Sequence, residues 1–222
     1  MSEQARYMRR EIARLQEENK ALKEEVLSLR RYITALDTLM AAVDEMDADH
    51  DAEIMALLNR ILSNAITLME AEAGSLLVLD EETGELVFVL SHGEVPQQRL
   101  AGVRIPPGKG IAGWVAEHRR PTIVNNARTD DRFFAGIDLR FQFQTNSILA
   151  VPILGDQRVL GVLELVNKEG GGLFHETDQI ILALLGRFAG ELLNNIIQRD
   201  QTAQATQADQ LSEPPPTDVD RM

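Results

Sequence analysis

Three glycines near the middle of the chain have the spacing of a phosphate-binding loop. Gly108, Gly110 and Gly113 match the string G-x-G-x-x-G, in which glycines let a backbone approach a pyrophosphate at the start of a helix. That chemistry requires a preceding strand in a parallel βαβ unit, whereas Ile-Pro-Pro at residues 105–107 precedes the glycines and the neighbouring strands look antiparallel. We therefore expect no dinucleotide site, and the segment forms either a tight connection or part of another ligand site.

Other residue types that support catalysis or metal binding are absent or scattered. Cysteine is absent, which removes disulfides, thiolate metal ligands, thiol nucleophiles and thioether-linked chromophores. The four histidines stand in separate predicted elements without the spacing of metal ligands, and they are His50, His92, His118 and His175. The serines near the strands lack the strand-to-helix elbow of a hydrolase nucleophile. The sequence therefore predicts a non-enzymatic protein without a metal.

Composition and charge indicate one ordinary domain with extensions. Of the 222 residues, 44% are hydrophobic and 26% are charged, which suffices for a core. The formal net charge of -13 disfavours nucleic acid as a partner, because phosphates are bound by clustered Lys and Arg. No apolar run is long enough to span a bilayer or to serve as a secretory signal. We expect a cytoplasmic protein that binds neither nucleic acid nor membrane.

The first part of the chain carries a heptad repeat, in which apolar residues recur at the two core positions of a coiled coil. The predicted dimer seam comprises Ile12, Leu15, Asn19, Leu22, Val26, Leu29, Ile33 and Leu36. β-Branched residues dominate one core position and leucine the other, and Asn19 interrupts the first, which favours two parallel strands in fixed register. The sequence predicts a homodimer through a parallel coiled-coil helix over residues 1–46. A helix folded back on its own domain is the alternative.

Residues 51–200 have the pattern of one α+β domain. Amphipathic helices are expected at residues 54–69, at 111–117 and at 176–199, where apolar residues cover more than one helix face. The strand-like runs are residues 75–79, 86–90, 122–124, 147–154 and 159–166. A hairpin turn joins the last two runs, so we expect an antiparallel sheet flanked by helices. After this domain, polar residues and a Pro-Pro-Pro run predict a disordered tail over residues 201–222.

Two segments of this domain resemble the GAF family. The first is the glycine-rich segment 108–116 with Asn-Asn at 125–126 and Asp-Asp-Arg-Phe at 130–133, and the second spans residues 147–153 and 160–168. The second segment is similar to the signature of GAF domains in cyclic-nucleotide phosphodiesterases and related cyclases.

That signature is matched here by Asn167, Lys168, Phe174 and Asp178, while Gln179 stands where the family pattern has Glu. The resemblance implies a PAS-like antiparallel sheet in which Lys168 and Asp178 form an ion pair that braces a ligand pocket. GAF proteins that reduce free methionine sulfoxide rely on cysteine thiolates, which this chain lacks.

The resemblance also implies residues that line the pocket. They are Trp114, Val124, Asn125, Phe133, Phe134, Thr145, Ser147, Val151 and Glu164. Their aromatic faces and hydrogen-bonding groups suit a small noncovalent ligand, with a cyclic nucleotide as the first candidate, although Glu164 would repel a phosphate if it pointed inward. We expect a ligand sensor that relays through its dimer helices to an unidentified signalling partner. The alternative is a ligand-free GAF dimerisation adaptor.

Overall fold

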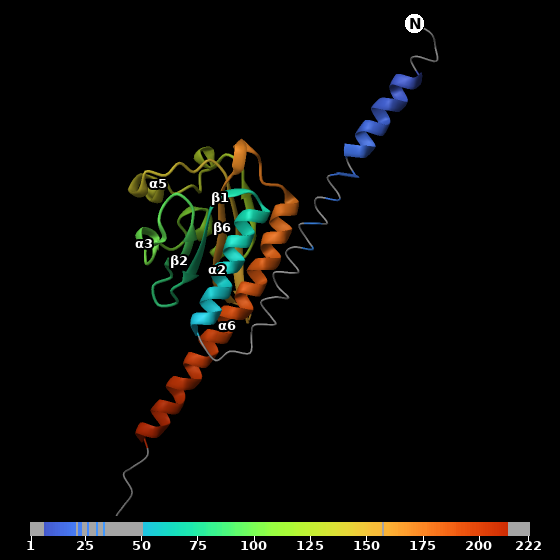
Figure 1. Ribbon diagram of the computed structural model, residues 1–222. Helices are drawn as coiled ribbons and strands as arrows, with labels where there is room; N and C mark the ends of the chain where they lie inside the picture. The colour runs from blue at the N-terminus through green and yellow to red at the C-terminus, as the bar shows by residue number, and fades with distance from the viewer. Residues whose placement is uncertain are drawn as a thin grey trace, which may run out of the picture.

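The computed structural model describes residues 7–20, 22–23, 26, 30, 33, 51–156 and 158–212. The elements are α2 (Asp51–Leu68), β1 (Ala71–Leu79), β2 (Leu86–His92), α3 (Gln97–Leu100), β3 (Arg104–Ile105), α4 (Gly110–His118), β4 (Thr122–Val124), the 3-10 helix η1 (Ala127–Thr129), α5 (Gly136–Phe141), β5 (Ile148–Gly155), β6 (Arg158–Lys168), the 3-10 helix η2 (Glu169–Gly171) and α6 (Glu176–Ser212). Figure 1 shows one sheet, with the long helix α6 beside α2.

The six strands of the described residues form one sheet in the order β3-β2-β1-β6-β5-β4, and each neighbouring pair is antiparallel. Every strand expected from the sequence is present, so the expected antiparallel α+β fold with flanking helices is confirmed. The short elements α3, β3 and α5 were not anticipated, because two to six residues carry too little periodicity to reveal them.

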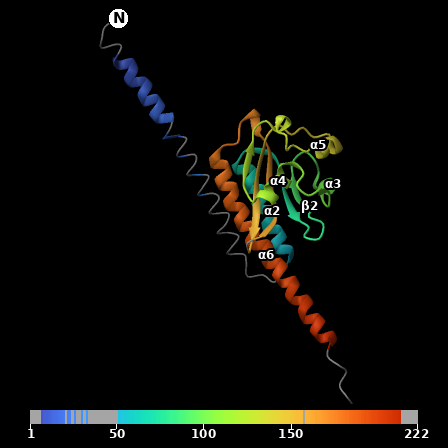
Figure 2. The ribbon, with the colours of Figure 1, turned by 180° about the vertical axis from the view of Figure 1, so that it is seen from behind.

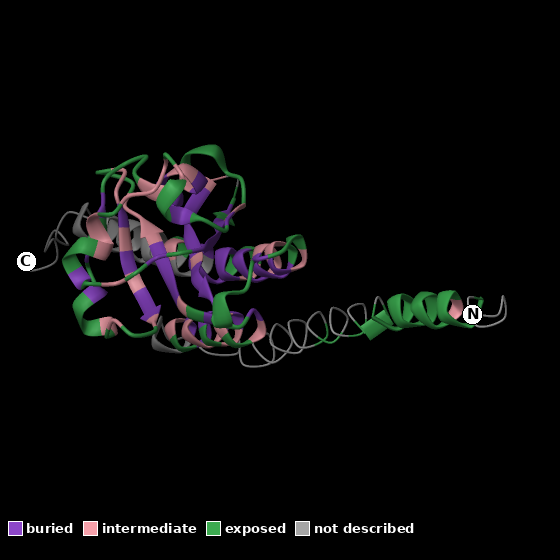
Figure 3. Cartoon of the chain, turned by 90° about the horizontal axis from the view of Figure 1, so that it is seen from above, coloured by how far each residue is buried: buried purple, intermediate pink, exposed green. Residues whose placement is uncertain are grey.

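The two faces of the sheet support separate cores, because successive side chains of a strand point to opposite faces. On β6, Leu163 and Leu165 join the core that α2 and α6 cover, whereas Val162 joins the core under α4. Seen from behind, α3, α4 and α5 lie on the side of the sheet away from α6 (Figure 2). Buried residues concentrate in the strands and on the helix sides that face them (Figure 3).

Helix α6 lies unusually close to the sheet. A Cβ atom added to Gly190 would stand 2.0 Å from the carbonyl oxygen of Leu154 on β5. Only a glycine lets the helix backbone approach this near. Helix α6 is thereby held against β5, which it contacts along much of their shared length.

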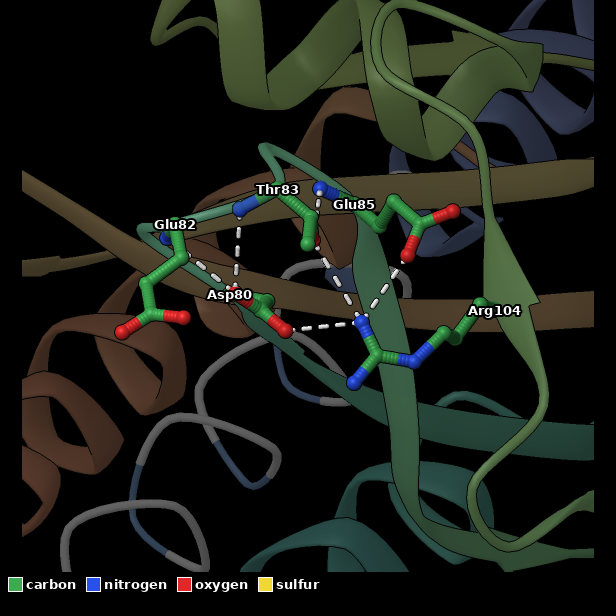
Figure 4. A network of polar contacts seen from close by, with 5 residues as sticks. All are labelled: Asp80, Glu82, Thr83, Glu85 and Arg104. Atoms are coloured by element: carbon green, nitrogen blue, oxygen red, sulfur yellow. Dashed lines mark hydrogen bonds and ion pairs between the residues drawn. The ribbon is translucent and has the colours of Figure 1, made fainter.

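An exposed arginine ties the edge strand β3 to the β1–β2 turn (Figure 4). Arg104 donates to the carboxylates of Asp80 at 2.7 Å and Glu85 at 2.9 Å. The hydrogen bond from Arg104 holds the pKa of Asp80 below its ordinary value, and the backbone N–H of Thr83 adds to this effect. Because β3 has two residues, these side-chain contacts help to place its buried residue, Ile105.

Helix α6 is longer than the sequence suggested. Residues 201–212, which were expected to begin a disordered tail, continue the helix to Ser212. This segment is rich in Ala and Gln, which are good helix formers, and extending an existing helix requires no new nucleus. Residues 213–222 lie outside the described part of the chain.

The N-terminal segment is helical at residues 7–20 and at the later positions that are described. Five apolar seam residues are about half exposed in the single chain, namely Ile12, Leu15, Leu22, Val26 and Ile33. Leu29, Leu36 and residues 34–50 lie outside the described residues. Pairing of two chains through this seam stays a prediction.

Candidate ligand cavity

A cavity of about 100 Å³ lies between the sheet and the helices α4 and α5. It opens on the face of the sheet away from α2 and α6, and five of the six strands contribute to its wall. Its aromatic residues are Phe88, Phe133, Phe134 and Phe143, and its polar residues are Ser75, His92, Asp138, Thr145 and Glu164. Its lining, as far as the chain is described, includes neither lysine nor arginine. The cavity is therefore mostly apolar with a few acceptor-rich polar groups.

The start of α4 forms one wall of this cavity. Gly110, Ile111 and Ala112 are the first residues of the helix and all three line the space. The preceding Lys109 provides no side-chain hydrogen bond to cap the helix. The first N–H groups of a helix lack intrahelical acceptors and carry partial positive charge. This wall can therefore accept an anionic or electron-rich ligand group.

Two neighbouring segments are joined at the cavity by Asp138 of α5. The backbone N–H of Thr145 donates to one carboxylate oxygen of Asp138 at 2.9 Å, and its hydroxyl donates to the other at 2.7 Å. Both side chains line the cavity. The pair fixes α5 against the loop that leads into β5.

Glu164 is the second carboxyl group of the cavity. It stands on β6 opposite Ser75 of β1 and Ala150 of β5, in the middle of the sheet. Burial raises the pKa of Glu164 to about 7, and the charge of Asp138 contributes to the rise. Within the described part of the chain, no group hydrogen-bonds the Glu164 carboxyl. Its neutral and ionised forms are therefore both accessible near neutral pH.

His92 comes from the end of β2. One of its ring nitrogens lies 2.9 Å from the side-chain oxygen of Asn59 on α2. This contact orients the imidazole at the rim of the cavity. It also connects the cavity to a helix on the other face of the sheet.

The ion pair implied by the family resemblance is present beyond the cavity. Lys168 Nζ lies 3.3 Å from the carboxylate of Asp178, and the two side chains are 8% and 0% exposed. The Asp178 carboxylate also accepts the backbone N–H of His175 at 2.9 Å. The pair therefore joins the end of β6 to the first turn of α6.

Asn167 holds the loop that carries Thr145. Its side-chain oxygen accepts the backbone N–H groups of Asn146 at 2.7 Å and Ser147 at 3.3 Å, and its amide donates to Gln144 O at 2.9 Å. Asn167 adopts a positive φ of 58°, which asparagine tolerates better than most residues. The signature pair Asn167 and Lys168 thus connects the cavity wall to α6.

The structure brings together four of the residues expected to line the pocket and separates the others. Phe133, Phe134, Thr145 and Glu164 line the cavity. Val151 does not, because the alternation of β5 places it in the core under α2 and α6. Val124 is buried in the core beside the cavity without reaching it.

The remaining three expected residues make local contacts instead. Asn125 donates to Phe174 O at 3.1 Å and accepts its N–H at 2.9 Å, which fastens β4 to the start of α6. Ser147 accepts the N–H of Lys168 at 3.1 Å. The guanidinium carbon of Arg132 lies over the Trp114 ring, 4.7 Å from the ring centroid. Trp114 is not part of the cavity lining.

Ser75, His92 and Asp138 also line the cavity, and the sequence did not indicate them. Ser75 directly opposes Glu164 across the β1–β6 pair. A correct prediction of that strand register would therefore have placed Ser75 beside Glu164 in the cavity. Asp138 belongs to a six-residue helix, and its place in the cavity depends on how α5 folds over the sheet. That arrangement has no signature in the local sequence.

An antiparallel sheet with long helices on one face and a cavity beneath short helices on the other defines an α+β domain that can enclose a small molecule. The chain belongs to the GAF domain family, whose model matches residues 51–194.

Two curated relatives are phosphodiesterases. The dual 3',5'-cyclic-AMP and -GMP phosphodiesterase 11A of Takifugu rubripes is 30% identical over 158 residues, which cover 67% of this chain and 18% of that protein. A probable 3',5'-cyclic phosphodiesterase of Caenorhabditis elegans is 28% identical over 167 residues, which cover 71% of this chain and 23% of that protein. The chain thus spans about a fifth of the length of these relatives.

Solved structures share the fold. The GAF domain of a phosphoenolpyruvate-protein phosphotransferase from Coxiella burnetii superposes with a TM-score of 0.65 at 20% identity, over 76% of this chain and 98% of that one. A free methionine-R-sulfoxide reductase from Neisseria meningitidis gives a TM-score of 0.62 at 20% identity, over 78% and 93% of the two chains. None of the described helices is long and apolar enough to cross a membrane.

Proposed function

We propose that this chain is a non-enzymatic sensor in which a small molecule, with a cyclic nucleotide as the first candidate, binds the cavity and changes the packing of the dimer helices. The observation that carries the proposal is that hydrogen-bond donors and hydrogen-bond acceptors lie at different walls of the cavity. The uncapped start of α4 offers N–H donors at one wall, whereas Asp138 and Glu164 offer acceptors at another. A cyclic nucleotide combines an anionic phosphate with a base that carries N–H donors.

The phosphate is accommodated by helix geometry rather than by side-chain charge. Backbone N–H groups at a helix start bind phosphate without any Lys or Arg. Glu164 would repel a phosphate placed beside it, so the phosphate belongs at the α4 wall and the base at the carboxyl side. The cavity phenylalanines, Phe133 and Phe134 among them, offer faces for the base.

Binding would require the cavity to expand. Its volume of about 100 Å³ is below the ~300–1,000 Å³ of typical ligand pockets. The segment that closes it is α5, which depends on the Asp138–Thr145 contacts. A ligand that prefers the expanded arrangement would shift the protein toward it by its difference in affinity for the two states.

The route from the cavity to the helices is short. Asn167 holds the loop that bears Thr145, and the next residue, Lys168, pairs with Asp178 at the start of α6. A displacement of that loop would therefore act on α6 directly. Downstream of α6 and the N-terminal helix, the signal would pass to a partner protein.

Calorimetric titration of the full-length chain with cyclic GMP and cyclic AMP tests this function. We expect saturable binding, and a ligand at 100 times its Kd should stabilise the fold by ~2.7 kcal/mol. Ala112→Leu, which fills the cavity from α4, should abolish binding, whereas Ala116→Leu on the same helix should preserve it. If neither nucleotide binds and no small molecule copurifies with the protein, the ligand-free adaptor becomes the better description.

A further inference from the structure

We propose that Glu164 reads the hydrogen-bonding edge of a purine in the cavity, and that its protonation state decides whether a guanine-type or an adenine-type edge is accepted. This inference rests on the proposed function, because it specifies which ligand the same cavity prefers. The residue is Glu164, whose carboxyl group makes no hydrogen bond or ion pair with the described residues that would give it a structural role.

The geometry around Glu164 leaves its carboxyl available to a ligand. On β6 it is flanked along the cavity face by Val162 and Val166, and its cross-strand neighbours are Ser75 and Ala150. Asp138 already receives both hydrogen bonds of Thr145 and is itself a carboxyl group. Glu164 is partly buried, and a carboxyl group removed from water without a hydrogen-bond donor is costly, so a bound donor would relieve that cost.

The other titratable side chains that face this space are few. His92 reaches the cavity from β2 and Asp138 from α5, whereas the cavity-lining residues from β1, β3, β5 and α4 are not ionisable. No cation among the described residues lines the cavity to lock Glu164 in its ionised form. The ligand itself can therefore determine which form is stable.

The two forms of a carboxyl group recognise different edges. An ionised carboxylate only accepts hydrogen bonds, so its two oxygens match the adjacent N1–H and N2–H donors of guanine. A protonated carboxyl presents one donor and one acceptor, which match the N1 acceptor and N6–H donor of adenine. The same residue can thus serve either purine, but in opposite protonation states.

Proton linkage follows from this pairing. Burial and the neighbouring Asp138 raise the pKa of Glu164 to about 7, so both forms are populated near neutrality. Binding of a guanine edge should release a proton below that pH, and binding of an adenine edge should take one up above it. The preference for guanine over adenine should therefore increase with pH.

The experiment is calorimetric titration of the full-length protein with cyclic GMP and cyclic AMP at about pH 6 and about pH 8, where neither base titrates. At one pH unit on the wrong side of the pKa, the competent form is about one tenth of the total, which weakens the apparent affinity about tenfold. The ratio of the two Kd values should therefore shift on the order of a hundredfold between these pH values. Repetition in buffers of different ionisation enthalpy counts the protons exchanged.

Glu164→Gln is the diagnostic variant, because an amide keeps one donor and one acceptor at every pH. It should bind cyclic AMP in preference to cyclic GMP, with no pH dependence and no proton exchange. His118→Gln, at a histidine outside the cavity lining, is the matched control, and it should retain the wild-type shift.

The outcomes separate the two proposals. If the wild type binds a nucleotide with a pH-independent preference, or if Glu164→Gln keeps the wild-type pH response, the role of Glu164 is refuted while the sensor function stands. If neither nucleotide binds the wild type or Glu164→Gln at either pH, the role of Glu164 is refuted, and the sensor function falls with it if no small molecule copurifies with the protein.

Discussion

Thr145 donates two hydrogen bonds to Asp138, from its hydroxyl at 2.7 Å and from its backbone N–H at 2.9 Å. The contact closes α5 over the cavity and places a buried hydroxyl next to a carboxylate. Hydrogen bonds to charged groups contribute about 1.5–3 kcal/mol, more than neutral ones.

Thr145→Val should therefore lower the free energy of unfolding by about 1.5–3 kcal/mol, because one oxygen of Asp138 loses its side-chain donor. Urea denaturation measures the change. Thr129→Val is the matched control, since the Thr129 hydroxyl bonds only an exposed backbone carbonyl and its loss should cost less. If both variants lost the same free energy of unfolding, the hydrogen bond from Thr145 to Asp138 would be no stronger than an exposed one to a backbone carbonyl.

Lys168→Ala should be among the more destabilising single substitutions. It leaves the fully buried carboxylate of Asp178 without the ammonium group 3.3 Å away, and breaking a buried pair typically costs ~3–5 kcal/mol. Gln179→Ala, at the neighbouring position of α6, should change the free energy of unfolding little. Thermal denaturation compares the two, and an unchanged melting temperature for Lys168→Ala would contradict the role of the pair as a brace.

Glu164 should make the protein less stable as the pH rises. Its pKa is raised from 4.5 to about 7 by burial, so the folded state holds the proton more tightly than the unfolded chain. The stabilising contribution is complete below about pH 4.5 and is lost as the pH passes about 7. At ~1.4 kcal/mol per pKa unit, the shift from 4.5 to about 7 amounts to at most about 3.5 kcal/mol.

Urea titrations of the wild type and Glu164→Gln at several pH values isolate this contribution, because the variant lacks the titrating group and keeps all others. As the pH rises from about 5 to about 8, the unfolding free energy of the wild type should fall relative to that of Glu164→Gln. A difference that is constant with pH would mean that Glu164 has an ordinary pKa.

Gly190→Ala should destabilise the protein although alanine is the better helix former by ~1 kcal/mol. The added methyl group would stand 2.0 Å from Leu154 O, and relief requires α6 to move away from β5. Overpacking of this kind typically costs ~1–3 kcal/mol. Glu191→Ala on the exposed side of the same helix is the control, and a Gly190→Ala variant as stable as the wild type would show that α6 can shift freely.

The predicted dimer can be tested on the full-length chain by light scattering. We expect a dimer at micromolar concentration, because the seam residues Ile12, Leu15 and Leu22 are exposed in the single chain. Leu22→Glu should shift the protein toward monomer, whereas Lys20→Glu outside the seam should not. Asn19→Leu should loosen the preference for two strands, since a buried asparagine selects register and oligomeric state. A monomeric wild type would contradict the coiled coil.

The sequence by itself determined the elements whose pattern is long or strongly periodic. The β5–β6 hairpin and the long helices followed from alternation and helical spacing. The resemblance carried by Asn167, Lys168, Phe174 and Asp178 identified the family and the ion pair. These features are local, so neighbouring residues suffice to specify them.

Tertiary structure decided which side chains meet at the cavity. Val151 and Glu164 lie on adjacent strands, yet one faces α6 and the other faces α5, because a shift of one residue reverses the side of the sheet. Asp138 and Thr145 reach the same space only when α5 folds over it. The raised pKa of Glu164 likewise depends on burial and on Asp138, two conditions that the chain creates only when distant segments pack together.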